Sequence, residues 1–222
     1  MSNARRDILA AVAAATEKDP NAAARVADRL SVHAANVIPQ RGAEGEQVVS
    51  RFIEEAERAG TDIRQVSALA DIPGVVSAYL REQNLAGDVR ISSDPISLNI
   101  PWADEALIAV SHGAAEPDDT ASLSVALCGI AETGTVMMKS SAENPVLLNY
   151  LPFLHVGLLP QSRIVGSLEM AWSALRRASG EGVMPRMVNL ITGPSRTADI
   201  EQELLMGAHG PQKHMVIILK EE

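Results

Sequence analysis

Apolar residues in the first sixty positions recur at the spacing of amphipathic helices. Helices are expected over 4–15, 22–36 and 48–58. In the last of these, Phe52, Ile53 and Ala56 share one face, charged residues lie between them, and Gly60 ends the run. We therefore expect an N-terminal helical arm over residues 1–60.

From residue 61 onward, short apolar runs alternate with amphipathic segments. This alternation is typical of βα units around a mainly parallel sheet. Strands are expected over 64–68, 88–92, 123–130, 135–139, 155–159, 187–192 and 214–219. Helices are expected over 75–83, 164–177 and 199–206, and a surface loop over 112–120. The pattern predicts one α/β domain over residues 61–222.

The composition supports an α/β core and argues against some partners. Hydrophobic residues make up 46% of the chain but aromatic residues only 3%, so the core depends on Ala, Val, Leu, Ile and Met. A net charge of −9 makes nucleic acid and anionic lipid poor partners. The longest apolar runs, such as 215–219, are much shorter than the roughly 20 residues of a membrane-spanning helix. Because no signal-peptide pattern precedes the arm, we expect a cytoplasmic location.

Cysteine and histidine usage limits the cofactor chemistry. Cys128 is the only cysteine, so the chain cannot form an internal disulfide or hold an iron–sulfur cluster with four thiolates of its own. Cys128 lies in an apolar strand and is expected to pack as a small hydrophobic residue. The five histidines show no HExxH or HxxxH spacing, so no metal site is predicted.

The first stretch that could carry chemistry is the turn over 130–135, between two expected strands. Gly134 can adopt a positive φ at little cost and allows a sharp reversal. The reversal would place Glu132 and Thr133 at the strand edge, beside Thr135. A carboxylate there could act as a base or a nucleophile, although a turn of this kind is also common without any function.

The second stretch joins the expected strand over 187–192 to the expected helix over 199–206. Backbone N–H groups at a helix start are unpaired and carry partial positive charge, which suits an anion. The stretch offers Gly193, Ser195, Arg196, Thr197 and Asp199. The Arg196 guanidinium could hold a carboxylate or phosphate with two hydrogen bonds. Helix capping by Ser195 or Asp199 is the equally plausible alternative.

The third stretch, 207–211, would end that helix. Gly207 or Gly210 suits a left-handed helix stop, and Pro211 prevents continuation. His209 would then lie on a loop and is a weak catalytic candidate. His155, on an expected strand, reads better as a hydrogen-bonded core or edge residue than as a ligand.

These stretches together resemble the LUD domain family in their order and spacing. The resemblance is carried by 131–135, the Leu151-Pro152 segment with His155, 193–201 and 207–211. It spans roughly residues 60 to 220, and the stretch Gly-Pro-Ser-Arg-Thr-Ala-Asp-Ile-Glu is long enough to be specific. Within the family, the chain is similar to the small C-type subunits of bacterial lactate utilization systems, because it lacks the cysteine-rich extension of the B-type subunits.

The resemblance implies a Rossmann-like three-layer sandwich, similar to that of the sugar-phosphate isomerases and CoA transferases. It also implies a part in the oxidation of L-lactate to pyruvate, together with two iron–sulfur partner subunits that carry the clusters. In related CoA transferases a strand-end Glu before a Gly-containing turn is the nucleophile, and Glu132 resembles that arrangement. The chain departs from the family over 124–129, which is unusually apolar.

Three hypotheses follow. In the first, the chain is an accessory subunit that binds a small organic anion or the iron–sulfur partners, and it could also form a homo-oligomer. In the second, it is a stand-alone CoA or acyl transferase or a sugar-phosphate isomerase, with Glu132 as nucleophile or base and Arg196 holding the anionic end of the substrate. The third is a purely structural assembly module. A second acid–base residue facing Glu132 would favour the enzyme.

Overall fold

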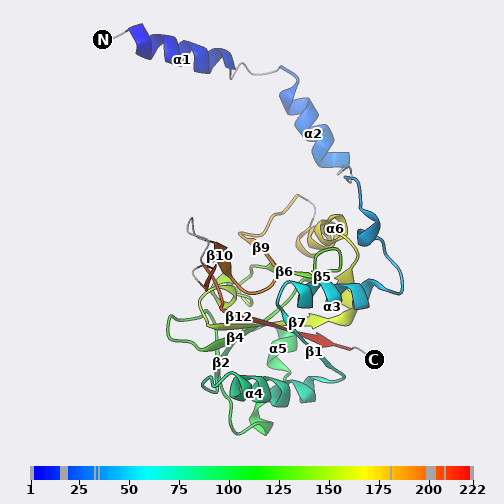
Figure 1. Cartoon of the computed structure of the whole chain (residues 1–222). Coiled ribbons are helices and arrows are strands. Elements are labelled where there is room, and N and C mark those ends of the chain that lie inside the picture. Colours follow the sequence, from blue (N-terminus) through cyan, green and yellow to red (C-terminus); the bar gives the residue numbers. More distant parts are fainter. Residues whose placement is uncertain are drawn as a thin grey trace. The chain divides into compact units, whose positions relative to one another are not determined.

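A computed structural model describes residues 3–15, 20–32, 34, 36–180, 182–198, 204–207 and 209–220 (Figure 1). The chain divides into two compact units, Met1–Asn36 and Val37–Glu222. In the first unit, α1 (Asn3–Ala15) and α2 (Ala22–Val32) confirm two of the predicted helices. Among the residues described, no helix has the length and apolarity needed to cross a bilayer.

A six-stranded sheet forms the centre of the second unit, and every neighbouring pair in it is parallel (Figure 1). In spatial order its strands are β1 (Asp62–Val66), β12 (Lys213–Leu219), β7 (Leu154–Pro160), β4 (Ala121–Val125), β2 (Asp88–Ile91) and β3 (Ala109–His112). All residues of β4 and β7 are buried. Such continuously buried strands are expected when both faces of a parallel sheet are covered. The predicted α/β fold with a mostly parallel sheet is confirmed.

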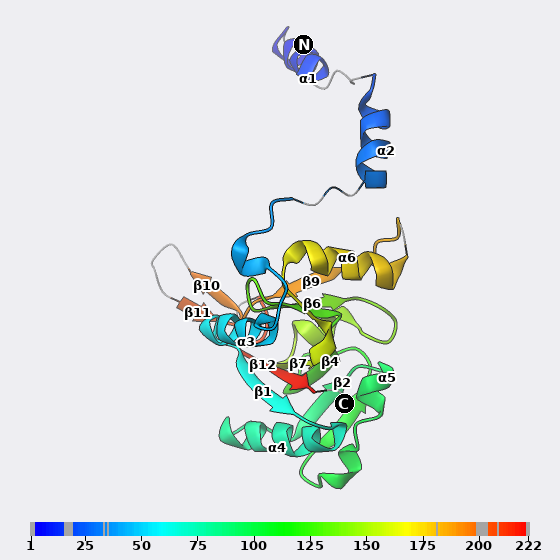
Figure 2. The ribbon, with the colours of Figure 1, turned by 90° about the vertical axis from the view of Figure 1, so that its right-hand side faces the viewer.

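One face of this sheet is covered by α4 (Ile72–Glu82) and by the segment that contains α5 (Pro95–Leu98), as Figure 2 shows. Val76, Tyr79 and Leu80 of α4 are buried in the same core cluster as Leu123 of β4. Ile100 and Trp102, which follow α5, belong to this cluster too. The connections from β1 to β2 and from β2 to β3 therefore both pack on this face.

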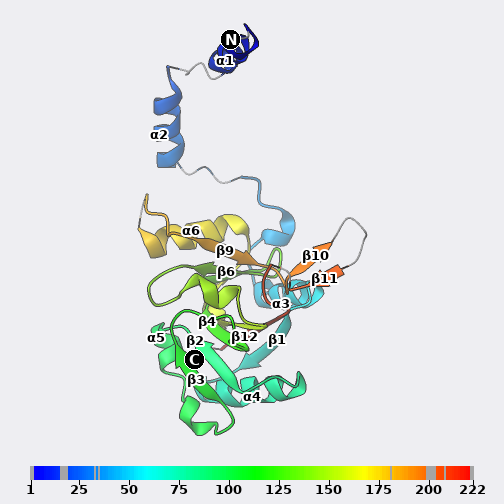
Figure 3. The same ribbon diagram turned by 90° about the vertical axis from the view of Figure 1, so that its left-hand side faces the viewer.

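The other face is covered by α3 (Val48–Arg58) and by a second sheet (Figure 3). In spatial order the second sheet contains β8 (Ile164–Val165), β5 (Cys128–Ile130), β6 (Thr135–Lys139) and β9 (Val188–Ile191). Its outer side packs on α6 (Leu168–Ser179) through a cluster that includes Ile130, Met137 and Leu175. The predicted sandwich thus gains an additional sheet between the parallel sheet and α6.

The helix α3 belongs to the core of the second unit. Phe52 and Ala56 are fully buried in a cluster with Leu159 of β7 and Val216 of β12. The turn between β5 and β6 also lies against α3, because a Cβ added to Gly134 would overlap the backbone nitrogen of Ala56. The expected arm over residues 1–60 is therefore divided, with α1 and α2 in the first unit and α3 in the second.

The expected strand over 123–130 is two strands that belong to different sheets. β4 ends at Val125, and β5 begins at Cys128. Between them the Ala126 N–H donates to Leu158 O of the parallel sheet at 2.8 Å, and the Leu127 N–H donates to Met137 O of the second sheet at 2.8 Å. One uninterrupted apolar run hides this change of sheet, since both halves are buried.

The expected helix over 199–206 is wrong for the residues that the structure describes. β10 (Arg196–Ala198) pairs antiparallel with β11 (Leu204–Met206), and residues 199–203 lie outside the described residues. The run Leu204-Leu205-Met206 has no helical period of its own, and three consecutive apolar residues suit a strand equally well. Its hydrogen bonds to β10 decide the outcome.

A buried polar chain crosses the centre of the parallel sheet. Ser124 Oγ donates to Asn149 Oδ1 at 3.0 Å and lies 2.8 Å from His155 Nε2. His155 Nε2 must therefore donate to Ser124, which leaves His155 Nδ1 as an acceptor for His214 Nδ1 at 3.1 Å. The two imidazole rings are stacked and buried. His155 is thus a hydrogen-bonded core residue, as the sequence indicates.

The histidine pair should make the fold sensitive to acid. Burial lowers the pKa of His214 from 6.5 to about 4, and burial together with the charge of His214 lowers the pKa of His155 well below 6.5. Above pH 6.5 both states of the chain hold these rings neutral. As the pH falls towards 4, only the unfolded chain takes up the protons, so the free energy of unfolding should fall by about 1.4 kcal/mol per pH unit for each ring.

Denaturant unfolding at a series of pH values measures this loss. His214→Gln can still donate to His155 but cannot take up a proton. The change in the free energy of unfolding per pH unit should therefore be smaller by the contribution of one ring. His112→Gln, a change at an exposed histidine, should leave the slope as it is. An identical slope in His214→Gln would contradict the account.

Gly134→Ala should destabilise the fold through two separate effects. Gly134 has a φ of +63°, and an added Cβ would overlap α3. Gly113 has a φ of +108° with open space around the Cβ position, so Gly113→Ala isolates the backbone cost of roughly 1–2 kcal/mol. Chemical denaturation should show a larger loss for Gly134→Ala than for Gly113→Ala. Equal losses would show that the turn does not press on α3.

Candidate functional site

Glu132 lies at the end of β5 and contacts the start of α6. Its backbone N–H donates to Gly166 O at 2.9 Å, and its carboxylate Oε2 accepts the Leu168 N–H at 3.3 Å. Leu168 is the first residue of α6, so the carboxylate satisfies an unpaired N–H at the positive end of that helix. The sequence prediction that Gly134 turns the chain with a positive φ is confirmed.

Three threonine hydroxyls form a chain beside Glu132. Thr133 Oγ1 lies 2.7 Å from Thr135 Oγ1, which lies 2.7 Å from Thr192 Oγ1 at the end of β9. Glu132 and these threonines line a cavity of about 320 Å³ together with Ile130, Leu168 and Leu190. We call it the Glu132 cavity. This cavity brings the turn over 130–135 together with Thr192, the residue just before Gly193 of the second stretch.

The rest of the second stretch leaves the Glu132 cavity. Gly193 has a φ of +76° and is packed against Ala59. The Arg196 guanidinium lies against Gly60, where an added Cβ would overlap it, and Arg196 is exposed. Arg196 and Glu132 therefore do not share a cavity lining.

The described residues just before the expected helix form a strand, β10, which includes the backbone of Thr197. Asp199, the first residue of the expected helix, lies outside the described residues.

The second and third stretches are held together through Ser195. Its N–H donates to Pro211 O at 2.9 Å, and its carbonyl accepts the Gly207 N–H at 3.0 Å. Gly207 has a φ of +80° but follows β11 instead of a helix. His209 is exposed on this loop and does not line the Glu132 cavity. The two backbone hydrogen bonds of Ser195 fix it against Gly207 and Pro211.

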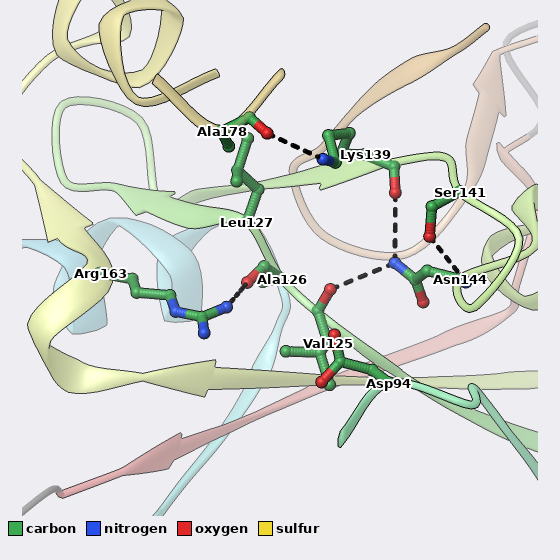
Figure 4. A pocket seen from close by; sticks show the side chains of 9 residues that line it. All are labelled: Asp94, Val125, Ala126, Leu127, Lys139, Ser141, Asn144, Arg163 and Ala178. Atoms are coloured by element: carbon green, nitrogen blue, oxygen red, sulfur yellow. Dashed lines mark hydrogen bonds between the residues drawn. The ribbon is translucent and has the colours of Figure 1, made fainter. Parts of the chain in front are cut away.

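A second cavity, of about 400 Å³, lies at the carboxyl ends of β2, β4 and β7 (Figure 4). We call it the switch-point cavity. Asp94 follows β2, Val125 ends β4, and Arg163 follows β7. The remaining lining residues are Ala126, Leu127, Lys139, Ser141, Asn144 and Ala178.

The topology explains why a cavity forms at this point. After β2 the chain continues through α5 to β3 on the α4 face of the parallel sheet. After β4 it continues through the second sheet to β7, on the opposite face and in the opposite direction along the sheet. Connections that diverge in this way leave a crevice outside the carboxyl ends of the two strands, which is where open α/β sheets bind ligands.

Two basic side chains line this cavity. Lys139 Nζ donates to Ala178 O at 3.5 Å, and Arg163 Nη1 donates to Ala126 O at 3.1 Å. Within the part of the chain that the structure describes, neither forms an ion pair. The pKa of exposed Glu143 is lowered mainly by hydrogen bonds from its own backbone N–H and from Ser141, and less by the charge of Lys139. Both cations therefore keep donors for a ligand.

Asn144 holds the walls of the switch-point cavity in place. Its Nδ2 donates to Val125 O at 3.3 Å and to Lys139 O at 3.4 Å, which ties the end of β4 to the end of β6. Its backbone N–H donates to Ser141 Oγ at 3.1 Å. The backbone of Lys139 is thus held by the buried amide of Asn144.

Sequence reasoning missed Asp94, Lys139 and Arg163. Each of them ends or closely follows an expected strand, and ligand-binding residues concentrate at the carboxyl ends of parallel strands. That rule was the available signal, but it needs the strand order, which the sequence does not provide. Cys128 is buried, and burial raises its pKa to about 12, which makes it a poor nucleophile. Among the residues described, no cluster of three or more His, Cys, Asp or Glu could hold a metal ion.

Comparison with known proteins assigns the chain to a family. A family model described as the LUD domain matches residues 119–219. Lactate utilization protein C of Geobacillus kaustophilus is 32% identical over 179 residues, covering 74% of this chain and 69% of that protein. Lactate utilization protein C of Shouchella clausii is 37% identical over 93 residues, covering 42% of this chain and 41% of that protein.

The chain thus spans about two fifths of the length of the curated relative from Shouchella clausii, but more than two thirds of the one from Geobacillus kaustophilus. The crystal structure of a DUF162 family protein from Deinococcus radiodurans superposes with a TM-score of 0.56 at 22% identity, covering 78% of this chain and 96% of that one. This likeness supports the fold alone. On the extended match to the Geobacillus protein together with the domain match, the chain belongs to the LUD domain family.

Proposed function

We propose that the chain is an accessory subunit of a bacterial lactate utilization system, which supports the oxidation of L-lactate to pyruvate and binds a small organic anion in the switch-point cavity. The observation that carries the proposal is the pair of basic side chains, Arg163 and Lys139, in a cavity of about 400 Å³ at the switch point of the parallel sheet. Relatives named lactate utilization protein C support the choice of system.

The charges favour the switch-point cavity over the Glu132 cavity for an anion. Arg163 and Lys139 offer N–H donors to a carboxylate, and a partly buried site strengthens such charge-assisted hydrogen bonds. The Glu132 cavity instead presents a carboxylate, three hydroxyls and apolar side chains. A carboxylate ligand would be repelled by Glu132, so the anion is assigned to the switch-point cavity.

The accessory role follows from the electron balance of lactate oxidation. Oxidation of a hydroxyl to a ketone releases two electrons, which a carrier must accept. The one thiol of the chain, Cys128, is buried and protonated. A single cysteine cannot supply the four thiolates of an iron–sulfur cluster. We therefore place the electron carriers on the two iron–sulfur partner subunits that the family resemblance implies.

One observation favours a second candidate function. Glu132 lines a cavity of about 320 Å³, and among the described residues its carboxylate accepts a hydrogen bond only through Oε2, from the Leu168 N–H. The other carboxylate oxygen would be available to attack an acyl group, as in a CoA or acyl transferase, or to act as a base in an isomerase. An acyl-CoA adduct that forms on the native protein and not on Glu132→Gln would favour this alternative.

Arg163→Gln and Lys139→Gln should weaken the binding of L-lactate, measured by calorimetry or by NMR titration. Each change removes charge-assisted hydrogen bonds to the anion, so we expect at least about a tenfold rise in Kd. Arg81→Gln and Lys220→Gln remove the same charges from exposed positions outside the cavity and should leave Kd unchanged. Equal affinity in all four variants would show that the anion does not occupy this cavity.

Lactate oxidation should require both the chain and its iron–sulfur partners. The purified chain alone should show no lactate turnover, and the reconstituted system should show it. In that system Arg163→Gln should lower turnover at subsaturating lactate, while Glu132→Gln should retain it. Turnover by the isolated chain, or loss of turnover confined to Glu132→Gln, would contradict the accessory role.

A further inference from the structure

Asp94 brings a negative charge to the switch-point cavity beside the two cations. It follows β2 and precedes α5, and its Oδ1 accepts the Ile96 N–H at 2.9 Å, which caps α5. Within the described part of the chain, Asp94 Oδ2 accepts no hydrogen bond and Asp94 forms no ion pair. In Figure 4 the Asp94 carboxylate lies on the side of the cavity opposite Lys139.

Most of the other polar groups of the lining are already engaged. Asn144 Nδ2 donates to two carbonyls, and Ser141 Oγ accepts the Asn144 N–H and bonds to Glu143. Asn144 Oδ1 has no hydrogen-bond partner in the described part of the chain, but it is buried away from solvent. The accessible side chains of the cavity therefore present N–H donors on Arg163 and Lys139 and a carboxylate acceptor on Asp94. A matching ligand carries a carboxylate for the donors and a hydrogen-bond donor for the acceptor.

We propose that Asp94 makes the switch-point cavity selective for 2-hydroxy acids over the corresponding 2-oxo acids. This inference rests on the anion site proposed above. In a 2-hydroxy acid the carboxylate contacts Arg163 and Lys139 while the hydroxyl donates to Asp94 Oδ2. In a 2-oxo acid the ketone oxygen has no proton to donate, so it would face the carboxylate of Asp94 and leave that charge unpaired. A site built to bond a hydroxyl rejects an analogue that lacks it.

The selectivity has a consequence for the direction of the reaction. The chain would hold the reduced acid and release the oxidised product, so a 2-oxo acid made by the partner subunits would not remain bound. The cavity is larger than a three-carbon acid requires, which extends the class to longer 2-hydroxy acids.

Asp94→Asn tests the assignment without removing the helix cap. Asparagine caps helices as well as aspartate does, so α5 should keep its start. The amide also offers an N–H that can donate to the ketone oxygen of a 2-oxo acid. Asp71→Asn is the matched control, because Asp71 is an exposed capping aspartate that bonds the N–H groups of Ser67 and Ala68 away from the cavity.

Kd values for L-lactate, pyruvate and propionate should be measured on the native chain and on both variants. The native chain and Asp71→Asn should bind L-lactate at least about tenfold more tightly than the other two acids, a difference of ~1.4 kcal/mol. In Asp94→Asn the ratio of pyruvate Kd to lactate Kd should fall to between about one and three. These results together support the assignment.

The contradicting outcomes separate the two proposals. If Arg163→Gln binds L-lactate as tightly as the native chain, or if no acid binds, the anion site itself fails and the selectivity fails with it. If the acids bind through Arg163 but with equal Kd values, the anion site stands and the role of Asp94 is overturned. A lactate preference over pyruvate that persists in Asp94→Asn overturns that role as well.

Discussion

The second unit depends on the burial of both faces of its central parallel strands. β7 and β12 carry apolar side chains towards α4 on one face and towards α3 and the second sheet on the other, and all residues of β4 are buried as well. Each connection between these strands must therefore cross over one face or the other. The connection after β2 takes the α4 face, and the connection after β4 takes the opposite one, so the chain opens a cavity between them. The position of the candidate site is thus a consequence of the layer arrangement.

The polar side chains buried at the centre of the parallel sheet are paired with one another in a definite way. Hydrogen bonds connect Asn149, Ser124, His155 and His214 in series, and both ring nitrogens of His155 are bonded. Burial keeps the two imidazoles neutral by lowering their pKa values. The switch-point cavity follows a different rule. Asn144 fixes its walls with donors directed at backbone carbonyls, while Arg163, Lys139 and Asp94 keep hydrogen-bonding capacity that the fold does not use. This unused capacity distinguishes a binding surface from a structural network.

The sequence predicts most elements of the second unit because their periodicity is local. The amphipathic run that ends before Gly60 and the strand over 135–139 need no information from elsewhere in the chain. The run over 123–130 misleads because burial in two different sheets looks the same as burial in one. The hairpin of β10 and β11 replaces the expected helix because pairing between segments, and not local preference, decides the structure of three-residue strands.

The candidate site shows the same division. Glu132 and the turn at Gly134 lie where the local pattern places them, and Thr192 joins them because β6 pairs with β9. Arg196 does not share their cavity, since the stretch that carries it turns towards Gly60. Asp94, Lys139 and Arg163 come from segments far apart in the chain and converge only through the strand order, so no local motif marks them.

A crystal of the chain soaked with L-lactate would show directly whether the switch-point cavity binds the acid. We expect density for the acid in this cavity, with its carboxylate on Arg163 and Lys139 and its hydroxyl on Asp94. Density for the acid in the Glu132 cavity, with an empty switch-point cavity at saturating lactate, would contradict this expectation.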